Sequence, residues 1–163
     1  WPWKLRVGAN TWIGEGAWIL NLEPVVIGSN TCISQEVLIC TGSHDRFSPT
    51  FEFDNGPIVI GDQTSISQNV HLCAGTHDWK NPAMPLIRSS ITIGSGVWIC
   101  ADAFIGPDVR VGSNCIVAAR AVVVKDVPDR TIVGGNPARI ISERPVATVV
   151  LGGSRPAQEA VQK

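Results

Sequence analysis

A six-residue period covers most of this 163-residue chain and sharply limits the folds open to it. Each hexapeptide begins with Ile, Val or Leu, often has Gly second, and carries a small or β-branched residue fifth. An α-helix has 3.6 residues per turn and would spread the first-position side chains around its surface. A generic β-sandwich would instead alternate apolar and polar residues in twos. The period therefore favours short strands joined by tight corners. The fourteen hexapeptides are VGANTW (7–12), IGEGAW (13–18), IGSNTC (27–32), ISQEVL (33–38), ICTGSH (39–44), IGDQTS (60–65), ISQNVH (66–71), LCAGTH (72–77), IGSGVW (93–98), ICADAF (99–104), IGPDVR (105–110), VGSNCI (111–116), VAARAV (117–122) and VVKDVP (123–128).

Three such strands complete a triangular coil of about eighteen residues. Coils stacked about 4.8 Å apart pair as parallel strands, and the first-position aliphatic side chains fill a continuous interior. We therefore expect an all-β chain whose main part, residues 1–141, is a single-stranded parallel β-helix of triangular coils. The period is interrupted by two protruding loops, 45–57 and 78–90. It is lost over 142–163, which we expect to form a C-terminal cap and a flexible tail.

The charge balance and the cysteines exclude some functions. Lys and Arg number 13 and Asp and Glu 14, so the net charge is −1 and the basic surface typical of nucleic-acid-binding proteins is missing. No apolar run approaches the ~18 residues that a membrane-spanning helix needs. We accordingly expect no nucleic-acid partner, no transmembrane segment and a cytoplasmic location. The five cysteines show no CxxC spacing, which favours reduced, buried thiols, with Cys40 and Cys73 in the core.

Two histidines, His44 and His77, each end a hexapeptide at the start of a gap in the period. Segments 31–61 and 64–94 align without gaps at an offset of 33 residues, and 13 of the 31 aligned positions are identical. The offset amounts to three hexapeptides and a loop, which is one full coil. We therefore expect the two histidines to lie above one another at the same corner, with both loops leaving on the same side.

Three stretches resemble the hexapeptide-repeat acyltransferases, with the greatest likeness to the colanic-acid or exopolysaccharide type and to maltose and galactoside O-acetyltransferases. They are ILNLEPVVIG (19–28), the pair CTGSHD (40–45) and CAGTHD (73–78), and VVVKDVPDRTIVGGNPARII (122–141). The resemblance covers roughly Val7 to Ile141. It implies a left-handed β-helix, assembled as a homotrimer, that transfers an acetyl group from acetyl-CoA directly to a sugar hydroxyl. The acceptor would be a free or lipid-linked sugar in exopolysaccharide or cell-surface glycan synthesis.

The resemblance also implies that one histidine at the start of a protruding loop is the general base. A neutral imidazole suits this role, because its usual pKa of about 6.5 lets it accept a hydroxyl proton near neutral pH. The N-terminal motif matches the family with His44 as the base, and the C-terminal motif matches it with His77. We favour His77, because the stretch 97–103, which resembles the acyl-CoA-contacting coil, adjoins its coil. Either histidine has the alternative role of anchoring its loop. The candidates for binding the acceptor are His44, Asp78, Asn21 and Glu23.

A coenzyme A site between the C-terminal coils and a neighbouring subunit is a further implication of the resemblance. Backbone amides would meet the pantetheine arm, and cations would meet the phosphates. Arg139 matches a residue expected at the 3′-phosphate, and Lys125 lies in the stretch near the adenine and phosphates. Both have the alternative role of solvated surface charges. The full set of candidates is Trp98, Ala101, Ala119, Val124, Lys125 and Arg139.

Two other functions stay open. The γ-class carbonic anhydrases have a similar fold and bind zinc through three histidines, and this chain has three, His44, His71 and His77. His71 and His77 are six residues apart on successive faces, so their side chains should diverge by about 120°. We therefore expect no metal. The non-enzymatic alternative is a structural β-helix whose duplicated coil has inactivated the site. The acceptor and the size of the acyl group depend on loops 45–57 and 78–90, whose conformations the sequence does not predict.

Overall fold

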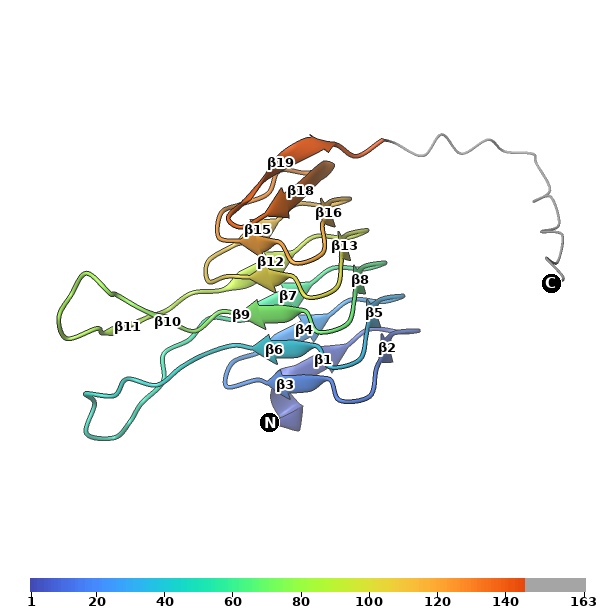
Figure 1. Cartoon of the computed structure of the whole chain (residues 1–163). Helices are drawn as coiled ribbons and strands as arrows, with labels where there is room; N and C mark the ends of the chain where they lie inside the picture. The colour runs from blue at the N-terminus through green and yellow to red at the C-terminus, as the bar shows by residue number, and fades with distance from the viewer. Residues whose placement is uncertain (146–163) are drawn as a thin grey trace, which may run out of the picture.

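Three sheets form the faces of a triangular stack in the computed structural model, which describes residues 1–145 (Figure 1). A 3-10 helix, η1 (Pro2–Lys4), precedes the first strand. The first sheet contains β1 (Leu5–Val7), β4 (Val25–Ile27), β7 (Ile58–Ile60), β12 (Ile91–Ile93) and β15 (Arg110–Val111). The second contains β2 (Trp12–Ile13), β5 (Cys32–Ile33), β8 (Ser65–Ile66), β13 (Trp98–Ile99), β16 (Ile116–Val117), β18 (Thr131–Gly135) and β19 (Ala138–Glu143). The third contains β3 (Trp18–Leu20), β6 (Leu38–Cys40), β9 (His71–Cys73), β14 (Phe104–Ile105) and β17 (Val122–Val123).

The interior of the stack is built from the first residue of each hexapeptide. Ile33, Ile66 and Ile99 follow one another in successive coils, paired in parallel register, and each is 0% exposed. The same pattern on all three faces produces one continuous aliphatic core. Burial of these side chains is the main stabilising term, because each removes apolar surface from water. The predicted parallel β-helix of triangular coils is confirmed.

The corners explain the other positions of the hexapeptide. At the second position Gly61 has no room for a side chain, because a Cβ atom there would lie 2.7 Å from the carbonyl carbon of Gly94 in the next coil. The fourth residue takes a left-handed φ, +54° at Asn30 and +57° at Asp108, which Asn, Asp and Gly tolerate best. At the fifth position Thr64 is buried, and its hydroxyl donates to the Gly94 carbonyl oxygen at 3.0 Å. Residue type at a corner thus follows from the close approach of the next coil.

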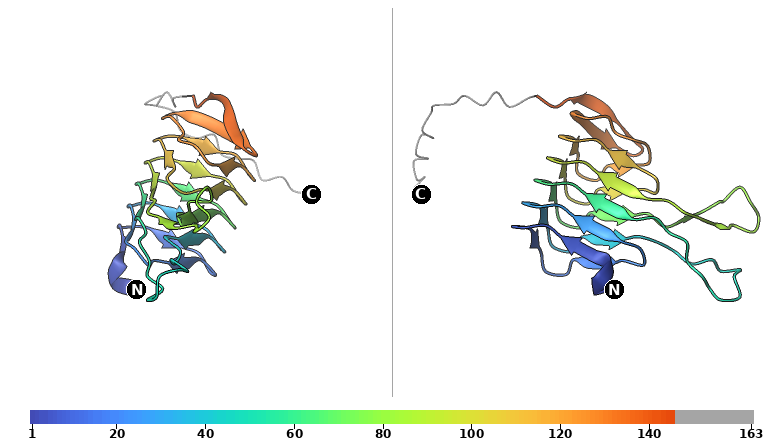
Figure 2. Two further views of the ribbon diagram at one scale, coloured as in Figure 1. Left: turned by 90° about the vertical axis from the view of Figure 1, so that its left-hand side faces the viewer. Right: turned by 180° about the vertical axis from the view of Figure 1, so that it is seen from behind.

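The 33-residue repeat stacks in register, as its sequence predicts. Each strand of the first copy pairs in parallel with its counterpart in the second, for example Cys32 with Ser65, Cys40 with Cys73 and Ile58 with Ile91. Both loops leave the stack on the same side (Figures 1 and 2). Loop 78–90 is braced at its base by two short antiparallel strands, β10 (Thr76–His77) and β11 (Leu86–Ile87).

The two ends of the stack differ. At the C-terminal end β19 turns back and pairs antiparallel with β18 as far as Glu143, covering the last coil (Figure 1). The rest of the expected cap and tail, residues 146–163, lies outside the described residues. At the other end Trp3 in η1 and Trp18 on β3 are largely exposed. No helix within residues 1–145 combines the length and the apolar character needed to cross a membrane.

Candidate active site

His77 lies at the end of β10, where loop 78–90 leaves the stack. Its Nδ1 atom is 2.8 Å from the carbonyl oxygen of Met84. Because a carbonyl oxygen only accepts hydrogen bonds, Nδ1 carries the proton and the lone pair of the neutral ring is on Nε2. Nε2 is 3.2 Å from Oγ of Ser43, whose hydroxyl donates to it from the coil below. The imidazole is thus held in the tautomer that can take a proton from an alcohol.

His44 is anchored in the same way one coil below. Its Nδ1 atom is 3.1 Å from the carbonyl oxygen of Phe51, again seven residues further along the chain. The Phe51 ring stacks on the imidazole with 4.6 Å between ring centroids, and Phe53 meets the imidazole edge-on at 5.8 Å. Both histidines therefore anchor their loops through Nδ1. They differ in surroundings, since His44 contacts two phenyl rings whereas Nε2 of His77 faces a hydroxyl.

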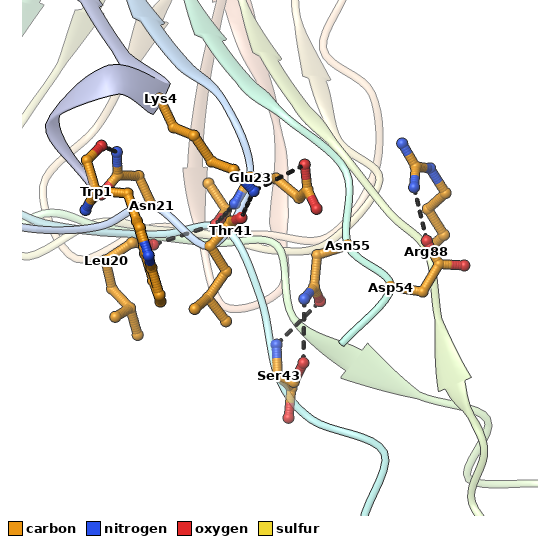
Figure 3. Close-up of polar contacts among 11 residues, drawn as sticks. Trp1, Lys4, Leu20, Asn21, Glu23, Thr41, Ser43, Asp54, Asn55 and Arg88 are labelled. Carbon is orange, nitrogen blue, oxygen red and sulfur yellow. Dashed lines mark hydrogen bonds and ion pairs between the residues drawn. The ribbon is translucent and has the colours of Figure 1, made fainter. Parts of the chain in front are cut away.

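Ser43 is held in place by Asn55, at the end of loop 45–57 (Figure 3). The Asn55 side chain is buried. Its Oδ1 accepts the backbone N–H of Ser43 at 3.0 Å, and its Nδ2 donates to the Ser43 carbonyl oxygen at 3.1 Å. Neither Ser43 nor Asn55 was predicted from the sequence as a site residue. A hydroxyl residue precedes each histidine, Ser43 and Thr76, and this was a usable signal for Ser43, but the counterpart of Asn55 in the second copy is Arg88.

Two of the predicted acceptor-binding residues lie in the first coil, two coils below His77. The side-chain amide of Asn21 donates to the carbonyl oxygen of Trp1 at 2.6 Å. The Glu23 carboxylate lies 3.8 Å from the Lys4 ammonium group. Both contacts tie the first coil to the segment that precedes it (Figure 3). The structure therefore does not bring Asn21 and Glu23 to the imidazole of His77.

The third predicted residue, Asp78, follows His77 directly and stabilises the start of its loop. Its carboxylate accepts the backbone N–H of Lys80 at 3.1 Å, the contact that characterises an Asx turn. The two loops also meet each other, because Arg88 of loop 78–90 lies 2.6 Å from the Asp54 carboxylate of loop 45–57 (Figure 3). Both side chains are exposed, so this ion pair contributes at most about 1 kcal/mol.

Cys40 and Cys73 are not core residues, and the sequence prediction was wrong on this point. The two lie in register on β6 and β9 and are half-buried, because Ile39 and Leu72 take the inward positions of these strands. A hydrogen bond from the Cys73 thiol lowers the pKa of Cys40 to about 6, although burial opposes the shift, and the same bond raises the pKa of Cys73. All five cysteines are free thiols, but Cys115 alone is fully buried.

This arrangement predicts that Cys40 reacts with iodoacetamide at pH 7 before the other thiols. The thiolate is the nucleophile, and its fraction at Cys40 rises as the pH increases through about 6. Burial raises the pKa of Cys100 and Cys115, so these should stay unmodified at neutral pH. Peptide mass spectrometry after timed labelling measures each site, with Cys40→Ser as the control. A rate that rises only near the ordinary thiol pKa, about 8.5, would contradict the assignment.

Three of the predicted coenzyme A residues come together at the C-terminal end. Val124, Lys125 and Arg139 line one pocket of about 250 Å³ beside β17 and the β18–β19 hairpin. Lys125 and Arg139 are both exposed, so their charged groups are accessible to a ligand. The combination of an apolar side chain with two cations suits a nucleotide with phosphate groups.

The other three, Trp98, Ala101 and Ala119, lie in or just after strands β13 and β16 of the second sheet and do not line this pocket. The turn that contains Ala119 sits directly above Ala101, since the N–H of the next residue, Arg120, donates to the Ala101 carbonyl oxygen at 3.0 Å. The Trp98 indole is 48% exposed, and its Nε1–H donates to Oγ of Ser67 at 3.0 Å. The six candidates therefore form two groups, and only one of them lines the pocket.

Within residues 1–145, no three His, Cys, Asp or Glu side chains gather closely enough to hold a metal ion. His71 is exposed on β9, where its neighbours in register are Leu38 and Phe104. Both ring nitrogens of His77 already have hydrogen-bond partners. The described part of one chain therefore does not supply the three-histidine set that the zinc alternative needs.

Comparison with known proteins finds similar sequences among the bacterial transferases. The model of the bacterial transferase hexapeptide (six repeats) matches residues 90–125. A putative colanic acid biosynthesis acetyltransferase, WcaF from Escherichia coli (strain K12), is 31% identical over 144 residues, which cover 88% of this chain and 61% of that protein. The chain is thus similar to the hexapeptide-repeat transferases. It spans about three fifths of the length of this curated relative.

Solved structures of hexapeptide-repeat transferases share its fold. A hexapeptide-repeat acetyltransferase from Vibrio cholerae, complexed with acetyl coenzyme A, has a TM-score of 0.71 at 26% identity, covering 88% of this chain and 72% of that one. A galactoside acetyltransferase in complex with coenzyme A has a TM-score of 0.69 at 25% identity, covering 86% and 64%. These matches confirm the left-handed hand of the β-helix.

The matched hexapeptide repeats include most of the coenzyme A candidates but neither candidate base. The coenzyme A candidates inside residues 90–125 are Trp98, Ala101, Ala119, Val124 and Lys125. His44, His77 and both protruding loops precede the matched repeats. The matched repeats thus contain most of the candidate donor site, and both candidate bases lie before them.

Proposed function

We propose that this protein is an O-acetyltransferase that moves an acetyl group from acetyl-CoA to a sugar hydroxyl, with His77 as the general base. The observation that carries the proposal is the fixed tautomer of His77, whose Nε2 lone pair faces a hydroxyl group. The acetyl coenzyme A in the Vibrio structure supports the donor, and the similarity to colanic acid and galactoside acetyltransferases supports the acceptor class. By this analogy the product belongs to exopolysaccharide or cell-surface glycan synthesis.

Transfer needs no covalent enzyme intermediate. The acceptor hydroxyl donates to Nε2 of His77 as its oxygen attacks the thioester carbonyl carbon in a ternary complex. The carbon–sulfur bond then breaks, and the imidazolium returns the proton to the departing CoA sulfur. Hydrogen bonding of Nδ1–H to the Met84 carbonyl oxygen stabilises the positive ring during this step. His44 remains the alternative base.

The donor would lie along the C-terminal coils, with Lys125 and Arg139 at its phosphates and Trp98, Ala101, Ala119 and Val124 along its length. We infer a homotrimer, in which a neighbouring subunit closes this site and covers exposed apolar side chains such as Trp98 and Val124. Acetyl-CoA as the donor places the reaction in the cytoplasm.

Calorimetric titration of the purified protein with acetyl-CoA tests the donor site without knowledge of the acceptor. We expect saturable binding of one acetyl-CoA per subunit. Arg139→Ala and Lys125→Ala should each weaken it by about tenfold, because a charge-assisted hydrogen bond to phosphate contributes roughly 1.5–3 kcal/mol, part of which solvent exposure removes.

The matched control is Lys80→Ala, which removes an exposed lysine of loop 78–90 and should leave the affinity unchanged. A folded protein that takes up no acetyl-CoA would overturn the transferase proposal in favour of a structural β-helix. Zinc retained at one per subunit and lost on changing His71 would instead favour the metal enzyme.

A further inference from the structure

The acceptor position at His77 is occupied by a side chain of the protein itself. Any alcohol that His77 activates must place its hydroxyl within hydrogen-bond distance of Nε2. Ser43 Oγ lies there, at 3.2 Å, although it is 34 residues earlier in the chain and belongs to the coil below. A hydroxyl bonded to a base that a third group orients, here the Met84 carbonyl, is the arrangement of an activated nucleophile.

The backbone around Ser43 is rigid, so this contact is built into the fold. The buried Asn55 amide brackets Ser43 with two hydrogen bonds, one to its N–H and one to its carbonyl oxygen (Figure 3). Gly42 makes room for this amide, because a Cβ atom at Gly42 would lie 2.0 Å from Cγ of Asn55. Ser43 is nevertheless only half-buried, which leaves its hydroxyl within reach of a bound thioester.

We infer that Ser43 is itself an acyl acceptor, so that the protein forms O-acetyl-Ser43 when acetyl-CoA is bound and no external alcohol is present. The inference rests on the proposed function of His77. Nε2 of His77 takes the proton of Ser43, Oγ attacks the thioester carbonyl carbon, the carbon–sulfur bond breaks, and the CoA sulfur leaves with the proton from the imidazolium. The products are one acetyl ester and one free CoA for each subunit that reacts.

This modification has a direct effect on the site. The ester removes the hydroxyl that bonded to His77 and places an acetyl group where an acceptor sugar would bind. O-acetyl-Ser43 therefore blocks transfer until the ester is hydrolysed. In that step His77 takes a proton from water as the water oxygen attacks the ester carbonyl carbon. The bond from that carbon to Oγ of Ser43 then breaks, Oγ takes the proton from the imidazolium, and acetate leaves. Acceptor-free enzyme would then consume acetyl-CoA slowly.

The test is to incubate the full chain with acetyl-CoA alone and to map acetylation by intact-protein and peptide mass spectrometry. We expect up to one acetyl group per subunit, on Ser43. The label should survive neutral hydroxylamine, which cleaves a thioester, and should be lost in alkaline hydroxylamine, which cleaves an oxygen ester but not an acetylated lysine. Ser43→Ala should abolish the label, and His77→Ala should slow its formation by ~10²-fold or more. Ser48→Ala, in the adjoining loop 45–57, is the control and should label normally.

Titration with acetyl-CoA distinguishes a failure of the Ser43 inference from a failure of the transferase proposal. Protein that binds acetyl-CoA but stays unmodified at Ser43, or carries acetyl groups only on lysines, would overturn this inference and leave the transferase proposal standing. Protein that does not bind acetyl-CoA would overturn both.

Discussion

Replacing His77 with Ala should lower kcat of acetyl transfer by ~10²–10⁴-fold, the usual contribution of a general base. The reason is geometric, since Nε2 of His77 carries the lone pair that faces a hydroxyl. The measurement is CoA release against a panel of mono- and oligosaccharides, with the binding of acetyl-CoA monitored separately. Binding should persist in the variant, because the predicted phosphate ligands lie in the last coils.

His44→Ala is the matched control, because it removes the equivalent histidine one coil away. We expect it to keep much of the activity and to weaken its own loop, where the imidazole stacks on Phe51. If His44→Ala proves the more damaging change, the base belongs to the lower coil and our choice of His77 is wrong.

Ile66→Ala should destabilise the protein by ~2–5 kcal/mol, the range for deleting a large aliphatic side chain from a tightly packed core. Ile66 is fully buried at the centre of the stack, between Ile33 below and Ile99 above. A cavity there cannot close easily, because parallel pairing fixes the spacing of the coils on both sides. Urea unfolding at one fixed protein concentration measures the change.

Val59→Ala is the control for this experiment. Val59 lies on β7 with its side chain outward and partly exposed, so its loss should cost at most about 1 kcal/mol. If both variants lower the free energy of unfolding equally, the aliphatic core is not the main source of stability.

The fold was predictable because stacking imposes a chemical requirement on each position of the hexapeptide. An aliphatic residue faces inward at Ile66, a missing side chain lets the next coil approach at Gly61, and a small residue fits the corner at Thr64. These requirements recur in every coil, so the sequence repeats them. The offset of 33 residues predicted the stacking of both loops for the same reason.

The side-chain contacts between coils were not predictable in this way. The bond from Ser43 to His77 depends on how two irregular loops begin, and no period describes those loops. For the cysteines, by contrast, the position in the hexapeptide was informative but was misinterpreted. Cys40 and Cys73 occupy the second position of their hexapeptides, just after the inward residue, so their side chains turn outward rather than into the core.

The in-register stacking of the 33-residue repeat makes the coil a fixed unit of length. One additional coil moves the parts of the protein on either side of it apart by a single strand spacing, about 4.8 Å, and leaves the pairing edges of both neighbours unchanged. The distance from the tryptophan-rich first coil to the pocket at Lys125 and Arg139 is therefore adjustable only in whole steps. Duplication within the gene can make such a step at once, without any redesign of the interior.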